Sequence, residues 1–558
     1  MSVKTIKNGT EWTVREGYEK IPERFNPDDL LSDLNDKYYT LIKENRVRSV
    51  ISMPGSDINE NGIYIKYFKR GDFRDYIKHL FVPTKARTEW DVGNALLSKD
   101  IKTALPLAIS EGKRCLLMVT ETVTDSEELM EFCQAHYEGS LSVGEESEKK
   151  ILLDKLALFI RDIHEKGFCH YDLHAGNILI KFKKEQNVAG YDLYLMDLHR
   201  VKIFKSISTS KRMFNLAQIF NSLSSIVTKA DKLDFIRSYG SNALGGITDE
   251  NELVRQIDEQ SSGIRNIHYR SRMKRCLKES SVFSRKRFSG IKMFYRTGYD
   301  TDSLQELIEK HNSALDNNDS AVIIKRDSKT VLTRHNFKDK TVQNVVVKQY
   351  RVGCFGRLLK SLFLGSAGRK AWVAGNGLRV YGFNTPLPLA LIEKRILGIP
   401  TDSYLIMEEV KGSLEMDRYI LKNFYNRKDI KKKKALISNF AKTLGEMHKH
   451  NIFHHDLKTC NIMVKENGKS FDFTFLDFDK VSFREEITVR KRVKNLTQIN
   501  LSTPRLFTLT DRLRFLKEYL GQCDITNEKK NILREVITLS KREKILYVSF
   551  QGDVTEDW

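Results

Sequence analysis

Three oxygen-bearing side chains recur at nearly the same spacing in two places along this sequence. In each place an aspartate is followed five positions later by an asparagine, and another aspartate ends the second of two short apolar strands. The sets are Asp172, Asn177 and Asp197, and Asp456, Asn461 and Asp477. A carboxylate can orient and deprotonate an acceptor hydroxyl, and amide and carboxylate oxygens are hard ligands for Mg²⁺. The pattern predicts Mg²⁺-assisted phosphoryl transfer, with the first aspartate of each set as catalytic base and the other two residues as metal ligands.

A lysine in a strand-like apolar segment precedes each set. Lys66 lies in IYIKYF and Lys348 in VVVKQY. A strand lysine can neutralise the α- and β-phosphates of ATP. Glu89 lies in the helical stretch that follows Lys66, and we expect it to pair with that lysine and hold it in place.

These landmarks repeat because the chain is an internal duplication. Residues 164–177 read HEKGFCHYDLHAGN, and residues 448–461, half the chain further on, read HKHNIFHHDLKTCN. The two strand lysines and the two strand-end aspartates are separated by nearly the same interval as these segments. A period this long indicates one domain used twice rather than a solenoid repeat of about 20–50 residues. We expect domain 1 over residues 1–285 and domain 2 over residues 286–558.

The elements that must position these residues can be read from the apolar periodicity. Apolar residues at helical spacing predict helices over 152–163 and 436–447, and Gly167 closes the first of them. Each helix leads into a loop (170–177 and 454–461) that carries the first aspartate, and then into two short strands. We expect His170 and His454, which begin these loops, to be structural rather than acid–base residues.

The segment HYDLHAGNILI followed by LMDLHR resembles the lipopolysaccharide core kinase family, which phosphorylates Kdo or heptose sugars. The resemblance covers about residues 45–240 and 330–520. It implies an α+β fold with two tandem bilobal protein-kinase-like domains, each with a small β-rich N-lobe and a larger helical C-lobe. It also implies ATP and Mg²⁺ as cofactors and a glycolipid or sugar as substrate. The alternatives are a kinase for a protein or another small molecule, and a regulatory scaffold in which one or both domains are pseudokinases.

The resemblance also indicates the nucleotide hinge and the acceptor. Glu121 and Glu408 lie where the inter-lobe hinge should be, so their backbone groups are expected to bind adenine. Tyr171 and His455 stand where protein kinases place an arginine before the catalytic aspartate, and helical sequence resumes shortly after Asp197. Little chain is left for a peptide-binding segment, which favours a small or glycan acceptor over a protein.

The second domain departs from the first at the helix carboxylate. The position equivalent to Glu89 is Ala371. If Lys348 has no carboxylate partner, domain 2 is expected to bind ATP poorly or to act as a scaffold. The other site residues remain, and Lys458 could neutralise a transferring phosphate. We therefore expect both domains to be active, with domain 1 favoured.

Composition limits the class of protein and its partners. The 558 residues include 94 Lys+Arg and 73 Asp+Glu, a net charge of +21, which favours polyanionic partners. No stacking-and-basic motif supports nucleic acid as that partner. No apolar run approaches the ~18–20 residues of a membrane span, and the N-terminus has no apolar signal region. Seven cysteines without a CxxC pair fit a reducing compartment, so we expect a cytoplasmic location.

One segment suggests a membrane surface. Residues 351–372 interleave apolar residues at helical spacing with Arg351, Arg357, Lys360, Arg369 and Lys370. This basic amphipathic pattern is typical of peripheral docking on anionic lipid at the inner face of the cytoplasmic membrane. The alternative is a helix whose apolar face packs on its own lobe.

Overall fold

The computed structural model divides the chain into two compact units, unit 1 (Met1–Ile267) and unit 2 (His268–Trp558). It describes all residues except 1, 8–9, 26–38, 45–47, 57, 70–78, 80–81, 113–114, 184–189, 247–248, 289, 338–342, 352–364, 397–398, 426–428, 484–485, 524, 550–551 and 557–558. The units divide within helix α8 (Glu250–Met273), N-terminal to the junction near 285 expected from the sequence. Met273 and Cys276 already belong to the buried core of unit 2.

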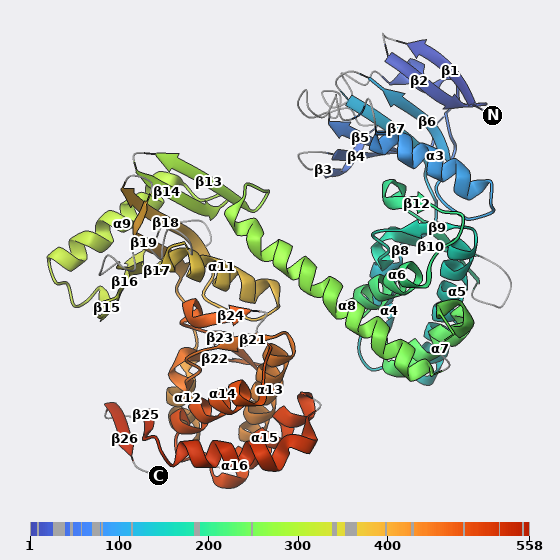
Figure 1. Cartoon of the computed structure of the whole chain (residues 1–558). Coiled ribbons are helices and arrows are strands. Elements are labelled where there is room, and N and C mark those ends of the chain that lie inside the picture. The colour runs from blue at the N-terminus through green and yellow to red at the C-terminus, as the bar shows by residue number, and fades with distance from the viewer. Residues whose placement is uncertain are drawn as a thin grey trace. The chain divides into compact units, whose positions relative to one another are not determined.

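The N-lobe of unit 1 is a seven-stranded antiparallel sheet in the order β1-β2-β6-β7-β5-β4-β3 (Figure 1). Its strands are β1 (Ser2–Lys7), β2 (Thr10–Arg15), β3 (Thr40–Glu44), β4 (Arg48–Met53), β5 (Ile63–Lys69), β6 (Pro106–Glu111) and β7 (Cys115–Glu121). Side chains alternate between the faces of a strand, so Ile63 and Ile65 of β5 enter a buried cluster with Val119 while Lys66 points to the other face. Helix α3 (Lys85–Leu97) begins at the capping side chain of Thr84. The short helix α1 (Ile21–Arg24) completes the described elements of this lobe.

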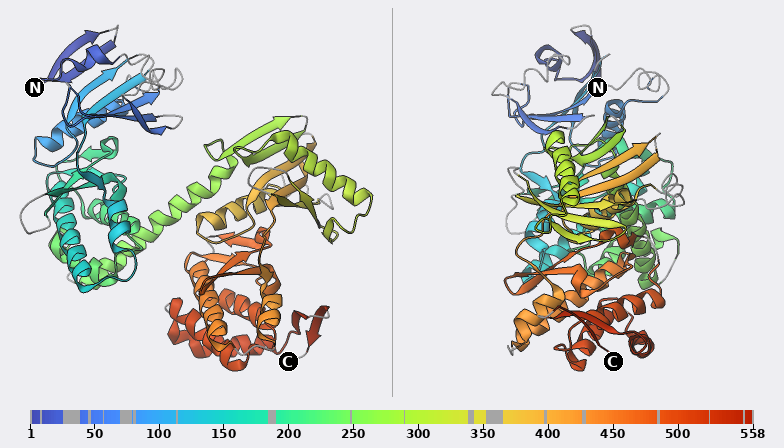
Figure 2. Two further views of the ribbon diagram at one scale, coloured as in Figure 1. Left: turned by 180° about the vertical axis from the view of Figure 1, so that it is seen from behind. Right: turned by 90° about the vertical axis from the view of Figure 1, so that its left-hand side faces the viewer.

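The C-lobe of unit 1 is mainly helical, and Figure 2 shows it from behind in teal and green. Its helices are α4 (Leu129–Tyr137), α5 (Val143–Glu165), α6 (Thr209–Ser222), α7 (Lys229–Tyr239) and α8, and their apolar faces form one buried cluster. Its strands are β8 (Ser126–Glu128), β9 (Phe168–His170), β10 (Ile178–Lys183), β11 (Gly190–Leu195) and β12 (Val201–Ile203). Helix α5 contains the helix predicted over 152–163. At Gly167, φ is +87° and a Cβ would lie 2.2 Å from the Phe204 carbonyl oxygen, so only glycine fits where this helix ends.

Unit 2 repeats this architecture, with the sheet order β13-β14-β18-β19-β17-β16-β15. The strands of this sheet are β13 (Phe283–Phe288), β14 (Ile291–Arg296), β15 (Ile323–Arg326), β16 (Thr330–Asn336), β17 (Asn344–Tyr350), β18 (Pro388–Ile396) and β19 (Ile399–Glu408). Helix α11 (Ala367–Val380) corresponds to α3. Helix α9 (Thr301–Asp316) adds Leu304, Leu307 and Ile308 to the core of this lobe.

The helices and strands of the C-lobe of unit 2 follow the order of unit 1 as far as α16, and a hairpin of two further strands comes after them. Its helices are α12 (Met416–Phe424), α13 (Ile430–Lys449), α14 (Val489–Ser502), α15 (Leu509–Gln522) and α16 (Lys529–Ser540). Its strands are β20 (Leu414–Glu415), β21 (Ile452–His454), β22 (Ile462–Asn467), β23 (Ser470–Phe475), β24 (Val481–Phe483), β25 (Ile545–Ser549) and β26 (Gly552–Glu556). The predicted tandem duplication of a two-lobed α+β domain is therefore confirmed.

The structure bears on one of the two expectations about membranes, the absence of a membrane-spanning helix, and not on the other, the amphipathic segment. Among the described residues, no helix combines the length and the low polarity that crossing a bilayer requires. Most of the basic amphipathic segment, residues 352–364, lies outside the described residues.

Candidate active sites

The strand lysine of unit 1 contacts the helix carboxylate expected from the sequence. Lys66 Nζ on β5 lies 2.6 Å from Glu89 Oε2 on α3, and the Glu89 side chain is only 3% exposed. The same Nζ is 3.9 Å from Asp197 Oδ1. Strand β5, helix α3 and the end of β11 therefore bring three of the predicted residues of unit 1 together.

Asp197 is held at a sharp turn after β11. It has φ +55° and precedes the 3₁₀ turn η3 (Leu198–Arg200). Arg48 Nη1 lies 3.0 Å and His199 Nδ1 3.1 Å from its Oδ1. Burial alone would raise the pKa of Asp197, but the adjacent His199 and the charges of Lys66 and Arg48 outweigh it and hold the pKa well below its usual range. The carboxylate is therefore ionised, as a metal ligand must be.

The loop between β9 and the 3₁₀ turn η2 (Ala175–Asn177) presents Asp172. The backbone N–H of Asp172 donates to His170 Nδ1 at 3.0 Å, and His170 Nε2 donates to the Met196 carbonyl oxygen at 3.0 Å. Asn177 Nδ2 donates to the Asp172 carbonyl oxygen at 2.8 Å. Both nitrogens of the buried His170 are occupied, so its role is structural, as predicted. The Asn177 amide oxygen accepts no hydrogen bond within the described part of the chain, which suits a ligand of a hard cation.

Two side chains of helix α6, neither of them predicted from the sequence, hold this loop by hydrogen bonds to its backbone. Asn215 Nδ2 donates to the His170 carbonyl oxygen at 2.6 Å, and Gln218 Nε2 donates to that of Tyr171 at 3.0 Å. Gln218 Oε1 accepts the Leu173 N–H at 3.1 Å. The pattern NLAQ at 215–218 recurs as NLTQ at 495–498, at the same interval as the strand-end aspartates, and could have identified them.

The buried histidines that brace these helices predict acid sensitivity. His164 contacts Tyr239 and Asn215, and His448 makes the equivalent contacts in unit 2. Burial lowers the pKa of each histidine to about 4. Because the unfolded chain takes up the proton near pH 6.5 and the folded chain only near pH 4, stability is expected to fall as the pH drops through this window. The loss is about 3 kcal/mol per histidine at its lower end.

Urea unfolding measured at pH 7 and pH 4.5 checks this expectation. The variants His164→Asn and His448→Asn should lose less stability between the two pH values than the unmodified chain. His268→Asn, at an exposed position, is the matched control and should leave the pH dependence unchanged. An identical pH dependence in all four proteins would contradict the expectation.

In unit 2 the strand lysine has two carboxylate partners. Lys348 Nζ lies 2.9 Å from Asp477 Oδ1 and 2.9 Å from Asp479 Oδ1. Asp477 follows β23 and has φ +46°, like Asp197, and Asp479 lies in the 3₁₀ turn η7 (Phe478–Lys480). Ala371 of α11, at the position of Glu89, is fully buried. The lost helix carboxylate therefore does not leave Lys348 without a partner.

The candidate base of unit 2 differs from that of unit 1 in its surroundings. Lys480 Nζ lies 2.9 Å from Asp456 Oδ2, and Lys458 Nζ lies 3.4 Å from Oδ1. Burial would raise the pKa of Asp456, but these two lysines outweigh it and lower the pKa. Asn461 Nδ2 donates to the Asp456 carbonyl oxygen at 2.9 Å, as in unit 1. Within the described residues, the carboxylate of Asp172 makes no ion pair. The two loops therefore have the same backbone hydrogen bonds, but only the aspartate of unit 2 is paired with lysines.

A pocket of ≈ 390 Å³ in unit 2 joins most of the predicted residues. Lys348, Glu408, Asn461, Asp477 and Asp479 line it, together with apolar side chains. The apolar group includes Leu332, Val346, Met407, Met463 and Leu476. The volume lies within the range of about 300–1,000 Å³ that is usual for small-molecule sites, and a lining that combines apolar side chains with a few charged ones suits a nucleotide.

The predicted hinge residues end the strands that lead out of each N-lobe, but their own amides are already paired. The N–H of Glu121 donates to the Leu105 carbonyl oxygen at 2.9 Å, and the N–H of Glu408 donates to that of Leu387 at 3.0 Å. The Glu121 carboxylate accepts a hydrogen bond from Asn59. A base bound at either hinge would therefore need another backbone donor.

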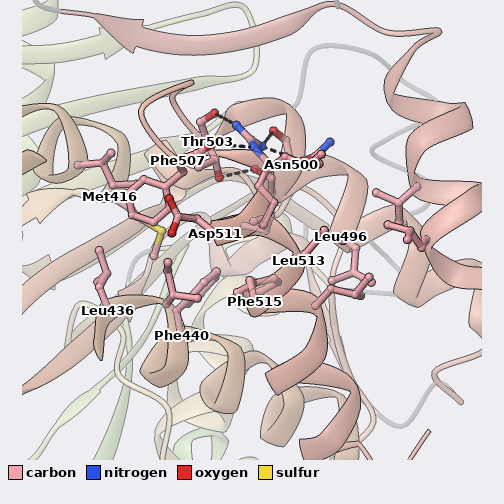
Figure 3. A pocket seen from close by; sticks show the side chains of 18 of the residues that line it. Met416, Leu436, Phe440, Leu496, Asn500, Thr503, Phe507, Asp511, Leu513 and Phe515 are labelled. Carbon is pink, nitrogen blue, oxygen red and sulfur yellow. Dashed lines mark hydrogen bonds between the residues drawn. The ribbon is translucent and has the colours of Figure 1, made fainter. Parts of the chain in front are cut away.

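A second pocket of unit 2 lies within the C-lobe and contains none of the predicted residues (Figure 3). It measures ≈ 290 Å³ and is almost entirely apolar, lined by side chains of α12–α16 such as Phe440, Leu496 and Phe515. At its edge the Arg512 guanidinium donates to the backbone carbonyls of Asn500 and Thr503. This pocket shares no lining residue with the pocket that contains Lys348 and Asp477.

Comparison with known proteins identifies the family. The model of the lipopolysaccharide kinase (Kdo/WaaP) family matches residues 35–239 and 325–519, which is more than half of the chain. The lipopolysaccharide core heptose(I) kinase WaaP of Escherichia coli is 25% identical over 173 residues, covering 30% of this chain and 65% of that protein. The enzyme of the same name from Pseudomonas aeruginosa is 24% identical over 194 residues, covering 33% and 71%. The chain thus spans about two thirds of the length of these curated relatives.

Two solved structures also match part of the chain. "WaaP in complex with acyl carrier protein" is 21% identical, with a TM-score of 0.35, and the match covers 45% of this chain and 98% of that one. An aminoglycoside-3'-phosphotransferase of type VIII is 14% identical, with a TM-score of 0.28, over 42% of this chain and 98% of that one. The family model matches each of the two units separately, and the chain belongs to the lipopolysaccharide kinase (Kdo/WaaP) family.

Proposed function

We propose that the chain is an ATP-dependent phosphotransferase that transfers the γ-phosphate to a sugar hydroxyl of a lipopolysaccharide inner core or a similar glycolipid. The observation that carries this proposal is the convergence of a buried strand lysine on a strand-end aspartate, with Lys348 Nζ 2.9 Å from Asp477 Oδ1. The corresponding atoms of unit 1 are 3.9 Å apart. Family membership and the names of the curated relatives support the sugar acceptor.

Each side chain has a defined role in the proposed reaction. Lys66 and Lys348 hold the α- and β-phosphates, and Asp172 and Asp456 orient the sugar hydroxyl and accept its proton. The hydroxyl oxygen forms a bond to the γ-phosphorus as the bond to the β,γ-bridging oxygen breaks, and ADP leaves. Bound Mg²⁺ would neutralise charge on the β- and γ-phosphates. Its oxygen ligands would be Asn177 and Asp197 in unit 1, and Asn461 and Asp477 in unit 2.

The short connection after the metal aspartate supports a sugar over a peptide. Residues 198–208 link Asp197 to α6, and they contain the turn η3 and the strand β12, which pairs with β9. Residues 478–488 make the equivalent link in unit 2. A peptide substrate would need a longer segment here to bind along.

A glycolipid acceptor would place the enzyme at a membrane surface, and the net charge of +21 favours anionic headgroups. The chain is expected to co-sediment with vesicles that contain phosphatidylglycerol, and binding should weaken as salt rises. Leu359→Glu and Arg357→Glu, in the basic amphipathic segment, should each reduce the bound fraction severalfold. Unchanged binding in both variants would instead favour packing of this segment on its own lobe.

The experiment that tests the proposed function is phosphorylation of purified inner-core lipopolysaccharide with ATP and Mg²⁺, read by mass spectrometry of the lipid. The unmodified chain should add the mass of one or more phosphates. The double variant Asp172→Asn/Asp456→Asn should add none while still binding ATP. If the unmodified chain binds ATP and phosphorylates nothing, the glycolipid acceptor is wrong, and a protein substrate or a scaffold role becomes the better interpretation.

A further inference from the structure

In kinase-like sites the strand lysine acts only when a carboxylate holds its ammonium group over the phosphates. In unit 1 that carboxylate is Glu89 on α3. Helix α11 of unit 2 offers only Ala371 at this position, and its methyl group is fully buried. A buried ammonium group without a counter-charge would be costly, so the carboxylate has to come from elsewhere in unit 2.

Asp479 supplies a carboxylate from a different segment. Its Oδ1 lies 2.9 Å from Lys348 Nζ, as close as that of Asp477, and the Lys348 side chain is only 8% exposed. Once Asp477 engages a metal ion, Asp479 is the carboxylate that remains for Lys348. The metal ligand and the partner of the lysine therefore lie on one turn of the chain, separated only by Phe478.

The two units differ at two positions that lie near the strand lysine: the helix position of Glu89 and Ala371, and the turn position of His199 and Asp479. Asp479 corresponds to His199, because each is the second residue after its strand-end aspartate. His199 Nδ1 lies 3.4 Å from Glu89 Oε1 and 3.1 Å from Asp197 Oδ1, so it bridges the two carboxylates. An aspartate there would crowd a third negative charge against them. One unit thus combines a helix glutamate with a histidine, and the other a helix alanine with an aspartate.

Helix α11 retains a packing role in unit 2. A Cβ on Gly375 would lie 2.8 Å from Cε2 of Phe478, so the helix backbone lies directly against the ring of the residue between Asp477 and Asp479. The helix supports the turn η7 by contact and contributes no charge at the Ala371 position.

We propose that Asp479 is the positioning residue for Lys348, in place of the helix glutamate, and that unit 2 is thereby a nucleotide-binding unit rather than an inert scaffold. This inference rests on the proposed function of the site. It means that the lysine of unit 2 is held by the same turn that carries the metal ligand, whereas the lysine of unit 1 depends on the position of α3.

A double-mutant cycle on ATP affinity tests whether Asp479 acts through Lys348. The whole chain carries Lys66→Met throughout, so that binding reports on unit 2, and affinity is measured by calorimetry both with Mg²⁺ and with EDTA. Asp479→Asn should weaken ATP binding about tenfold with Mg²⁺, the size of one lost charge-assisted interaction, and less with EDTA, where Asp477 remains free to hold Lys348. In a Lys348→Met background the same substitution should change the affinity less than about twofold. Asp479→Glu, which keeps the carboxylate, should retain most of the affinity.

Three outcomes would overturn the inference. One is an equal effect of Asp479→Asn in both backgrounds, which would indicate a general structural role. Another is a loss in the Mg²⁺ medium that Lys348→Met leaves unchanged and EDTA abolishes, which would make Asp479 a metal ligand only. The third is unchanged or tighter binding by Asp479→Asn, with thermal unfolding showing that the variant is folded. Failure of the proposed function gives different results. If the Lys66→Met chain does not bind ATP, both the proposed function of unit 2 and the inference about Asp479 are wrong. If ATP binding depends jointly on Asp479 and Lys348 but no lipid is phosphorylated, only the proposed glycolipid acceptor is wrong.

Discussion

Phosphate transfer by unit 1 is expected to fall by about 10²–10⁴-fold when Asp172 is replaced by asparagine, the usual contribution of a general base. Asparagine has the same shape but cannot accept the hydroxyl proton. The backbone bonds that Asp172 makes to His170 and Asn177 do not involve its carboxylate, so the loop should keep its geometry. ATP affinity should therefore remain within about twofold. The measurement is the rate of lipid phosphorylation beside ATP binding by calorimetry.

Asp456→Asn makes the same test in unit 2, where Lys480 and Lys458 would lose their partner. A phosphate that disappears in only one variant identifies the working unit, and different phosphates lost in the two variants would make both units enzymes. The matched control is Asp162→Asn, on the exposed side of α5, whose ion pair with Lys166 is worth at most about 1 kcal/mol. Wild-type rates in both Asp172→Asn and Asp456→Asn would contradict the assignment of these aspartates as bases.

Much of the fold follows from sequence because its landmarks occur twice. The helix over 152–163 has an unbroken apolar stripe, and Gly167 stands where only glycine fits. The contact of Lys66 with Glu89 was predictable because a strand residue and the first turns of the following helix meet in a compact lobe. These features depend on local pattern and short separation along the chain.

The sequence could not predict the partner of Lys348 in the same way. Comparing the two units position by position shows Ala371 as a lost carboxylate, whereas the replacement, Asp479, lies in the other lobe and far along the chain. Only the folded chain shows that Asp479 lies beside the Lys348 ammonium group. Likewise, the paired amides of Glu121 and Glu408 depend on contacts with the neighbouring strand ends and have no signature at those residues.

Unit 1 should lose about 10²-fold in phosphate transfer with Glu89→Ala and regain most of it when His199→Asp is added. The single substitution leaves the Lys66 ammonium without its 2.6 Å partner, and a reacting group displaced by about 1 Å can cost this much. The double variant gives unit 1 the residues that unit 2 has at Ala371 and Asp479. Both replacements are smaller than the native side chains, so neither overpacks the site.

The rate of lipid phosphorylation in an Asp456→Asn background isolates unit 1 for this comparison. His199→Asp alone is the essential control, because it adds a third carboxylate beside Glu89 and Asp197 and should lower the rate rather than raise it. Recovery in the double variant to within about tenfold of the parent would show that either segment can hold the lysine. If the double variant is as slow as Glu89→Ala, with thermal unfolding unchanged, then the carboxylate must sit on the helix. In that case a carboxylate on the turn does not replace the helix glutamate, and the inference that Asp479 positions Lys348 loses this support.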